Sequence, residues 1–171
     1  WVRSMADGGD VRIEATGAVV LGSRAAASGP ADTTIEADTL SVKAGAEITV
    51  FEADGVDINQ IWSTSQSPIT VLAGGDLALN ADISTSGHAI DLRASVGALT
   101  LNGVLSTGGG SVSLQAASGV TLTELSGVTT QGGTVVVDAG DAALLMAKFA
   151  VIDASGGALH LAAGDLMTLG T

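Results

Sequence analysis

Short runs in which apolar and polar residues alternate recur along the chain at nearly constant spacing. One set of runs starts at Ile69, Ile90, Val112, Val135 and Leu159, so successive starts are 21, 22, 23 and 24 residues apart. Such alternation is typical of β-strands that bury one face. Two further sets follow within each period, at 77–79, 99–101, 120–122, 144–146 and 166–168, and then at 61–64, 83–85, 105–107, 128–130 and 152–154. Each period therefore predicts three short strands.

The amino-terminal part follows the same rule with longer periods. Val11, Leu40 and Ile69 are each 29 residues apart, and so are Val19, Ile48 and Leu77. Two insertions would account for the extra length: a segment rich in Ala, Ser and Gly near 22–34 and an acidic segment near 51–60. We expect both to leave the coil as surface loops, which often carry function in repeat proteins.

A unit of three such strands cannot close a core alone, because each strand leaves both edges unpaired. Stacking the next unit pairs those edges and aligns the Ile, Val and Leu side chains in columns. The sequence therefore predicts an all-β fold, a right-handed parallel β-helix with 21–29 residues per coil, as a single domain over 1–171. About seven coils at the usual strand spacing would form a rod about 30 to 35 Å long.

Composition and charge narrow the functional classes. The chain has two Trp, two Phe and no Tyr, which argues against a rich recognition site for sugars, nucleic acids or proteins. A formal net charge of −12 disfavours nucleic acid and anionic membrane surfaces as partners. The sequence has no Cys, and it has no apolar run long enough to span a membrane.

The segment 90–110, with its equivalents across 69–171, resembles the repeats of filamentous-haemagglutinin-like proteins of the bacterial surface. The resemblance implies a right-handed parallel β-helix that is exported, to the medium or the surface of a Gram-negative bacterium, as a rigid shaft for adhesion or cell contact. The secretion domain with an Asn-Pro-Asn-type motif, which two-partner exported members carry, does not occur in these residues. We expect the 171 residues to be a segment of a longer protein.

The expected role is accordingly structural: a shaft that projects a distal domain or builds an extracellular fibre. Its partners would be other segments of the same chain, or neighbouring copies stacked on the coil ends. A receptor on a host cell, a bacterial cell or the matrix is a further candidate. The alternative is an adhesive surface made by the two insertions.

A polysaccharide-active enzyme on the same fold is the less favoured class. Such enzymes need paired carboxylates or basic residues in a groove with aromatic platforms. The outward positions of the first strands include one acid, Asp91, and one histidine, His160, about 14 Å apart by strand spacing. Common nucleophile, phosphate-loop and zinc-protease motifs are missing. We therefore expect no enzyme activity.

Two turn aspartates are the candidate metal ligands. Asp141 and Asp165 each lie four residues past the end of a first strand, so adjacent coils would place them about 5 Å apart, where they would repel or share a cation such as Ca²⁺. The favoured interpretation is solvated turn residues, because Asp tolerates turn conformations and the nine-residue calcium-repeat spacing is missing. We expect no cofactor.

Two further features follow from the alternation. A column of Thr64, Thr85, Thr107 and Thr130 invites comparison with ice-binding solenoids, but alternation after an inward residue turns these side chains inward, which favours a hydrogen-bonded corner ladder. Trp62 follows the inward Ile61 and therefore points outward. It is either a contact residue for a partner or, as we favour, a lid packed over a strand edge.

Overall fold

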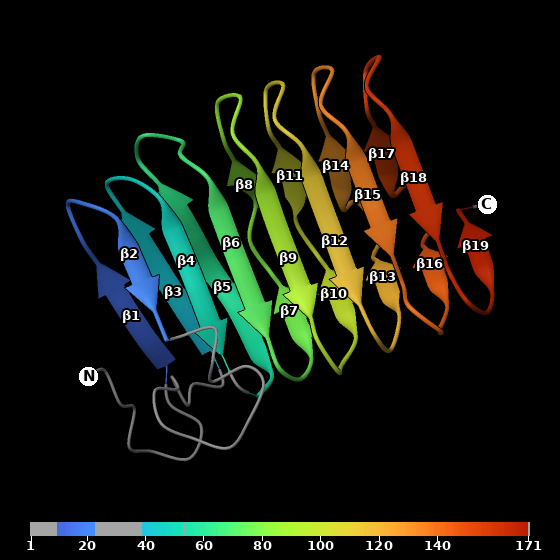
Figure 1. Ribbon diagram of the computed structural model, residues 1–171, viewed down its shortest axis with the longest axis horizontal. Coiled ribbons are helices and arrows are strands. Elements are labelled where there is room, and N and C mark those ends of the chain that lie inside the picture. The colour runs from blue at the N-terminus through green and yellow to red at the C-terminus, as the bar shows by residue number, and fades with distance from the viewer. Residues whose placement is uncertain (1–9, 23–38, 53, 171) are drawn as a thin grey trace.

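The computed structural model describes residues 10–22, 39–52 and 54–170, and these form a parallel β-solenoid of about six turns (Figure 1). The described residues form strands and turns, without a helix. The predicted all-β parallel β-helix is confirmed, and the number of turns is close to the predicted seven. No helix in the described part of the chain is long and apolar enough to cross a membrane.

The strands form three parallel sheets that run along the solenoid axis. The eight-stranded sheet contains β1 (Asp10–Glu14), β3 (Thr39–Ala44), β5 (Val56–Ser63), β7 (Leu77–Leu79), β10 (Leu99–Leu101), β13 (Val120–Leu122), β16 (Leu144–Met146) and β19 (Met167–Leu169). The seven-stranded sheet contains β2 (Val19–Leu21), β4 (Ile48–Glu52), β6 (Ile69–Ala73), β9 (Ile90–Ala94), β12 (Val112–Ala116), β15 (Val135–Asp138) and β18 (Leu159–Ala162). The four-stranded sheet contains β8 (Ile83–Ser84), β11 (Val104–Ser106), β14 (Gly127–Thr129) and β17 (Val151–Asp153).

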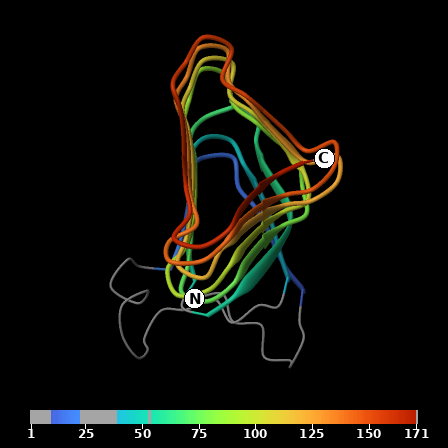
Figure 2. The ribbon, with the colours of Figure 1, turned by 90° about the vertical axis from the view of Figure 1, so that its right-hand side faces the viewer.

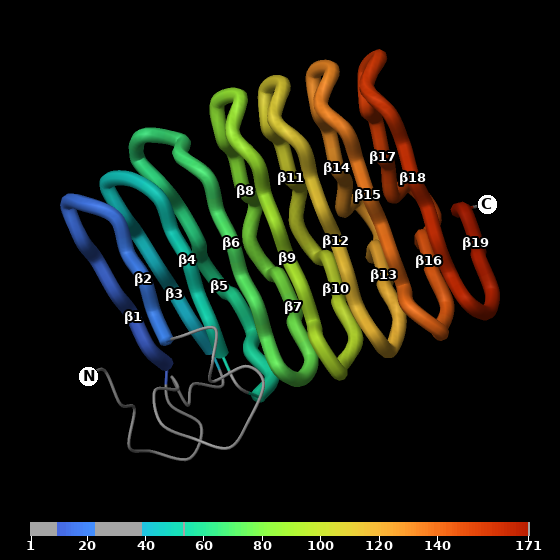
Figure 3. Tube along the Cα trace, viewed as in Figure 1, coloured from blue at the N-terminus to red at the C-terminus, as the bar shows by residue number. Residues whose placement is uncertain are grey.

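The core consists of columns of aliphatic side chains that stack from coil to coil. In the seven-stranded sheet, one inward column contains Val19, Ile48, Ile69, Ile90, Val112, Val135 and Leu159. Members of this column up to Val135 are buried, and from Ile48 to Val135 a neighbouring coil covers them on each side. The tube in Figure 3 shows the same path repeated by successive coils. The predicted spacing of the first strands from Ile69 onward is thus confirmed. The second strand predicted at 166–168 was wrong by one residue, because Leu144 pairs with Met167 and the strand is Met167–Leu169.

The predicted alignment of the amino-terminal coils is half wrong. Val11 pairs with Leu40 and Val19 pairs with Ile48, as predicted. However, Leu40 continues to Ile58 instead of Ile69, and Ile48 continues to Ile69 instead of Leu77. The coil that begins at Ile48 therefore has the short length of the later coils.

The cause is the acidic segment near 51–60, which is not a loop. Residues 51–52 complete β4, and 56–63 form the eight-residue strand β5, with the side chains of Val56, Ile58 and Ile61 buried. Burying these three apolar side chains in line with the columns above and below favours a strand over a protruding loop. The other predicted insertion, near 22–34, lies outside the described residues except for Gly22.

The coils widen along the chain because one corner becomes longer. The two inward residues that flank this corner are Leu79 and Ile83, then Leu101 and Leu105, then Leu122 and Val128. In β3 the corresponding residues, Leu40 and Val42, lie in one continuous strand. The four-stranded sheet consequently begins only at β8, and Figure 2 shows that the later coils enclose a larger cross-section than the first ones.

A second corner is stabilised by buried threonines. The hydroxyls of Thr85, Thr107 and Thr130 donate to the carbonyl oxygens of His88, Gly110 and Gly133, three residues ahead in each case. The predicted inward corner ladder is confirmed for these three residues.

Thr64 does not belong to this ladder. It is exposed, and Ser63 is the buried residue at the corner of that coil. Because Ile61 points inward, alternation turns Trp62 outward and Ser63 inward. The Ser63 Oγ atom accepts a hydrogen bond from the Ser67 amide at 3.1 Å. The prediction for Thr64 was therefore shifted by one residue. The separate third strand predicted at 61–64 was wrong, because 61–63 is the end of β5 in the eight-stranded sheet.

Candidate functional site

The strands β1, β3 and β5 present one group of outward side chains, here called the Trp62 face. Their register places Glu14 beside Lys43, and Lys43 beside Trp62. On each of these strands, the residues two positions before and two positions after Glu14, Lys43 and Trp62 also point outward. The Trp62 face contains Arg12, Glu14, Thr16, Ser41, Lys43, Gly45, Gln60, Trp62 and Thr64.

A β-bulge sets the register of this face. Leu40 pairs with Ile58, but the next residue, Ser41, pairs with Gln60, so Asn59 is the extra residue. A bulge of this kind changes which side chains of the following strand point outward. After it, Ile61 lies in the core beside Val42, and Trp62 lies outside beside Lys43.

Trp62 is 49% exposed, although it is one of the largest side chains in the protein. The Nζ atom of Lys43 lies 5.4 Å from the centroid of its ring, a distance typical of a cation–π contact. The ring is thus held on one side by the neighbouring strand and remains open to solvent elsewhere. Its predicted outward orientation is confirmed.

Charges on the first strand interact directly. The Arg12 guanidinium and the Glu14 carboxylate form an ion pair with an N–O distance of 2.6 Å. The hydrogen bond from Arg12 lowers the pKa of Glu14 below its ordinary value, and the positive charges of Arg12 and Lys43 act in the same direction. Both side chains of the pair are largely exposed, so the pair itself contributes little to stability.

A hollow of about 500 Å³ lies beside this row. Its walls are formed by Glu14, Ala15, Thr16, Lys43, Gly45 and Thr64. Gly45 has no side chain to fill the space, and a Cβ atom there would lie 1.7 Å from the carbonyl oxygen of Thr16. The close approach of two coils therefore fixes glycine at this position.

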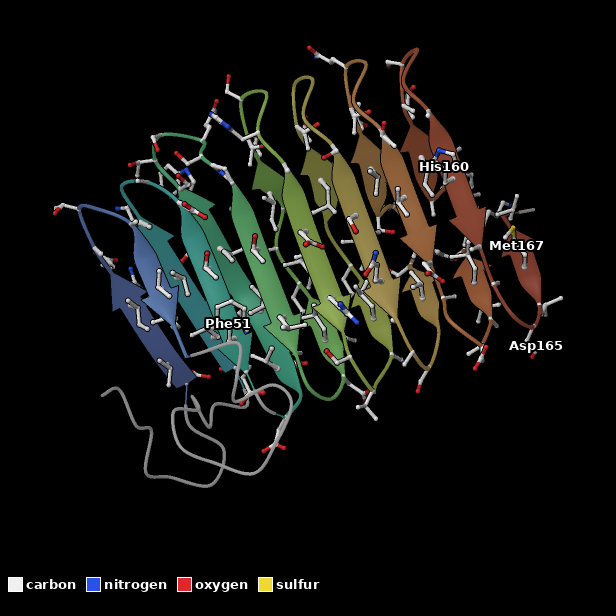
Figure 4. The ribbon with its side chains drawn as sticks, viewed as in Figure 1. Phe51, His160, Asp165 and Met167 are labelled. Atoms are coloured by element: carbon white, nitrogen blue, oxygen red, sulfur yellow. The ribbon has the colours of Figure 1, made fainter. Side chains whose placement is uncertain are left out.

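Asp141 and Asp165 lie on adjacent turns, but they are offset by one residue. Gly164 donates its amide hydrogen bond to the carbonyl of Gly140, and Asp165 donates to the carbonyl of Ala142. Both aspartates are exposed, and Figure 4 shows Asp165 at the outer edge of its turn. Within the described residues, no group of three or more His, Cys, Asp or Glu is close enough to hold a metal ion.

Asp91 and His160 lie in one outward row of the seven-stranded sheet, as predicted. Pairing runs from Asp91 through Ser113 and Val136 to His160, so three strand spacings, about 14 Å, separate the two. His160 points away from the core (Figure 4). The geometry does not bring these residues together as an acid–base pair.

The next outward row of the same sheet was not singled out from the sequence. Arg93, Gln115 and Asp138 succeed one another in register. They line a small hollow of about 140 Å³ together with Ser95, Ala116 and Ala117. The sequence signal for this row is the alternation of the first strands, because each of its residues lies two positions after a residue of the Asp91 row.

Three asparagines form a ladder that the sequence analysis also missed. The side-chain amide of Asn80 donates to Asn59 at 3.1 Å, and that of Asn102 donates to Asn80 at 2.7 Å. Their spacings of 21 and 22 residues match the coil period, which was the available signal. The ladder joins three successive coils and has a structural role.

No protein-family model, curated protein or solved structure matches this chain.

Proposed function

We propose that this chain is a rigid spacer within a large exported bacterial surface protein of the filamentous-haemagglutinin-like type. In that role it holds a distal domain away from the cell or forms part of an extracellular fibre. The observation that carries the proposal is the parallel pairing that continues from β1 to β19 along the whole eight-stranded sheet.

Such stacking suits a spacer for a physical reason. Each coil bonds only to the coil before it and the coil after it, so length increases with coil number while the cross-section is set by local sequence. The Asn80 ladder adds side-chain hydrogen bonds between neighbouring coils, and these bonds resist bending between coils. The Thr107 hydroxyl donates to a carbonyl three residues ahead and so stiffens a corner within one coil.

Charge supports an exposed location for the spacer. The net charge of −12 disfavours adsorption to nucleic acids and anionic membranes, and it opposes collapse of neighbouring shafts onto one another. Localisation at the cell surface or in the medium is part of the proposal.

The alternative adhesive surface made by two loops loses one of its components. Residues 56–63 are a strand, so the surface feature in this region is the Trp62 face and not an acidic loop. Binding at that face is compatible with a spacer, because the outward side chains can change without altering the core.

The spacer role can be tested by surface display of the chain between an outer-membrane anchor and a terminal binding tag. Removal of 90–111 deletes one coil, since Ile90 and Val112 occupy equivalent positions. The proposal predicts that the tag reaches immobilised ligand less well in the deletion variant, and that the outward substitution Thr70→Ala has no effect. Equal reach with and without the coil, under equal display, would contradict the spacer role.

A further inference from the structure

We propose that the Trp62 face binds one acidic sugar unit, such as a uronic acid at the end of an otherwise neutral glycan. This inference goes beyond the spacer role, since it assigns a ligand to one part of the outer surface. It rests on three features that lie side by side: an exposed indole ring, an available ammonium group and a polar hollow.

The indole ring of Trp62 provides the stacking surface. The core beneath it is filled by Ile61 and Ser63 of the same strand, both buried, so packing of the core does not require the ring. Lys43 contacts one side of the ring, while 49% of the residue remains exposed. Indole offers a large, rigid apolar area at low entropic cost, which suits the C–H face of a pyranose ring.

Lys43 provides the charge that selects an acidic sugar. Among the described residues, the only ion pair joins Arg12 to Glu14. Lys43 forms no ion pair within the described residues, although its charge also acts on the neighbouring Glu14, and its position beside Trp62 places charge and stacking surface in one row. Two of the four described basic residues, Arg12 and Lys43, lie on this face, whereas Arg93 and Lys148 lie elsewhere.

The hollow provides hydroxyl groups and space. Thr16 and Thr64 form part of its walls, with Gly45 of the intervening strand between them. Its volume of about 500 Å³ falls within the range of about 300 to 1,000 Å³ that is common for small-ligand sites. Hydroxyl, carboxylate and ammonium groups around one hollow match the hydrogen-bonding groups of a sugar.

The surrounding acids limit the ligand to a single negative charge. Asp10 lies two residues before Arg12 in β1, and Asp57 occupies the same register position in β5, with Thr39 between them. A second anionic unit extending over these strands would meet two carboxylates. The net charge of −12 repels a polyanion over the rest of the surface.

The test is a titration of the 171-residue protein carrying Trp1→Phe, which leaves Trp62 as the only indole. The probe is a disaccharide of glucose that ends in glucuronic acid. Its neutral counterpart ends in glucose, and a sulfated polysaccharide serves as the polyanion. We expect a saturable change of indole fluorescence with a Kd of about 1 mM for the acidic probe and binding about tenfold weaker for the neutral one.

Variants separate the contributions, with calorimetry replacing fluorescence where the indole is removed. Trp62→Ala should abolish binding of both disaccharides, and Lys43→Met should weaken the acidic probe about tenfold while leaving the neutral probe unchanged. The matched control is Phe149→Ala, which removes a second exposed cation–π pair, with Lys148 Nζ 5.1 Å from the ring, at the other end of the solenoid. This control should bind like the starting protein.

Three results would overturn the proposal: no saturable binding of the acidic probe, equal binding by the Lys43→Met variant, or tighter binding of the polyanion than of the disaccharide. Circular dichroism verifies the fold of each variant. Should Trp62→Ala fail to fold, Lys43→Met still decides, because Lys43 is an outward residue of a strand whose core side chains are unchanged. Failure here leaves the spacer role testable through the coil deletion.

Discussion

The side-chain amide of Asn102 donates a hydrogen bond of 2.7 Å to the side chain of Asn80, one coil earlier. Asn80 in turn donates to Asn59, so it is the middle member of a three-coil ladder with two of these bonds. The ladder begins at the bulge residue Asn59 within β5 and continues at the residues that directly follow β7 and β10. We expect each asparagine side-chain hydrogen bond to add separately to the free energy of unfolding.

Removing the middle asparagine should therefore cost more than removing an end. We expect Asn80→Ala to lower the free energy of unfolding by about 1 to 2 kcal/mol, and Asn102→Ala to lower it by about half of that, because net contributions near 1 kcal/mol are typical of a hydrogen bond. Urea denaturation followed by circular dichroism measures both. Equal effects of the two substitutions would argue against a ladder in which each bond adds separately to stability.

At the corner with the buried threonines, removing an inward hydroxyl should lower the stability of the protein more than removing an outward one. Thr107→Val removes the donor to the Gly110 carbonyl and should destabilise the protein by about 1 to 3 kcal/mol. The outward neighbour Ser106 is the control, and Ser106→Ala should change stability by less than about 0.5 kcal/mol. Thermal unfolding that ranks the two variants in the opposite order would contradict the assigned orientation.

Gly45 tests the close contact between the first two coils. In Gly45→Ala, the added Cβ atom would meet the carbonyl oxygen of Thr16, so the coils must separate, and we expect a loss of about 2 to 4 kcal/mol. Gly17 is the matched control, because a Cβ atom there has no neighbour within 4 Å. Chemical denaturation should show Gly17→Ala close to the original protein.

The pKa of Glu14 provides a test of the Arg12 contact. The lowered pKa means that the folded state favours the carboxylate, a contribution present above the ordinary pKa and lost as the pH falls through the lowered value. Arg12→Ala should raise the pKa of Glu14 towards its ordinary value, and Lys43→Met should raise it less, since Arg12 makes the hydrogen bond. An NMR titration of the Glu14 carboxyl carbon measures both shifts. No rise in Arg12→Ala would refute the contact.

The two ends of the described solenoid differ in exposure. Val11 and Val19 are each only 5% exposed in the first coil, whereas Leu159, Met167 and Leu169 are 45%, 38% and 50% exposed in the last. Unpaired strand edges with exposed apolar residues promote association. If copies stack at this end, Leu169→Lys should reduce self-association in analytical ultracentrifugation, and Val20→Lys, at an exposed position in β2, should not. A monomer at all concentrations would argue against stacking of copies.

The sequence predicted those features that depend only on the repeat. In the first strands from Ile69 onward the spacing changes by one residue at a time, so their inward column, the row from Asp91 to His160 and the corner threonines follow from counting. Alternation also predicted the outward orientation of Trp62.

Register that departs from the repeat could not be predicted in this way. The polar pair Asn59–Gln60 interrupts the alternation of β5 and gives the strand the appearance of a loop, although it is a bulge between two apolar stretches. The Trp62 face depends on that bulge, since Glu14, Lys43 and Trp62 are 29 and 19 residues apart and share no period. Glu52 is a similar case: its buried position in line with Ala73 and Ala94 follows from the register of β4.

The central claim, that coils stack to set the length of a rod, is tested most directly by scattering from an elongated variant. Val112, Val135 and Leu159 occupy equivalent positions, so 112–158 comprises two whole coils and can be duplicated in tandem. The elongated variant carries two extra copies of 112–158 and therefore has four more coils than the original protein. At the usual strand spacing its maximum dimension should be about 19 Å greater, with an unchanged cross-sectional radius. Growth in all directions, or no growth along the axis, would contradict the account.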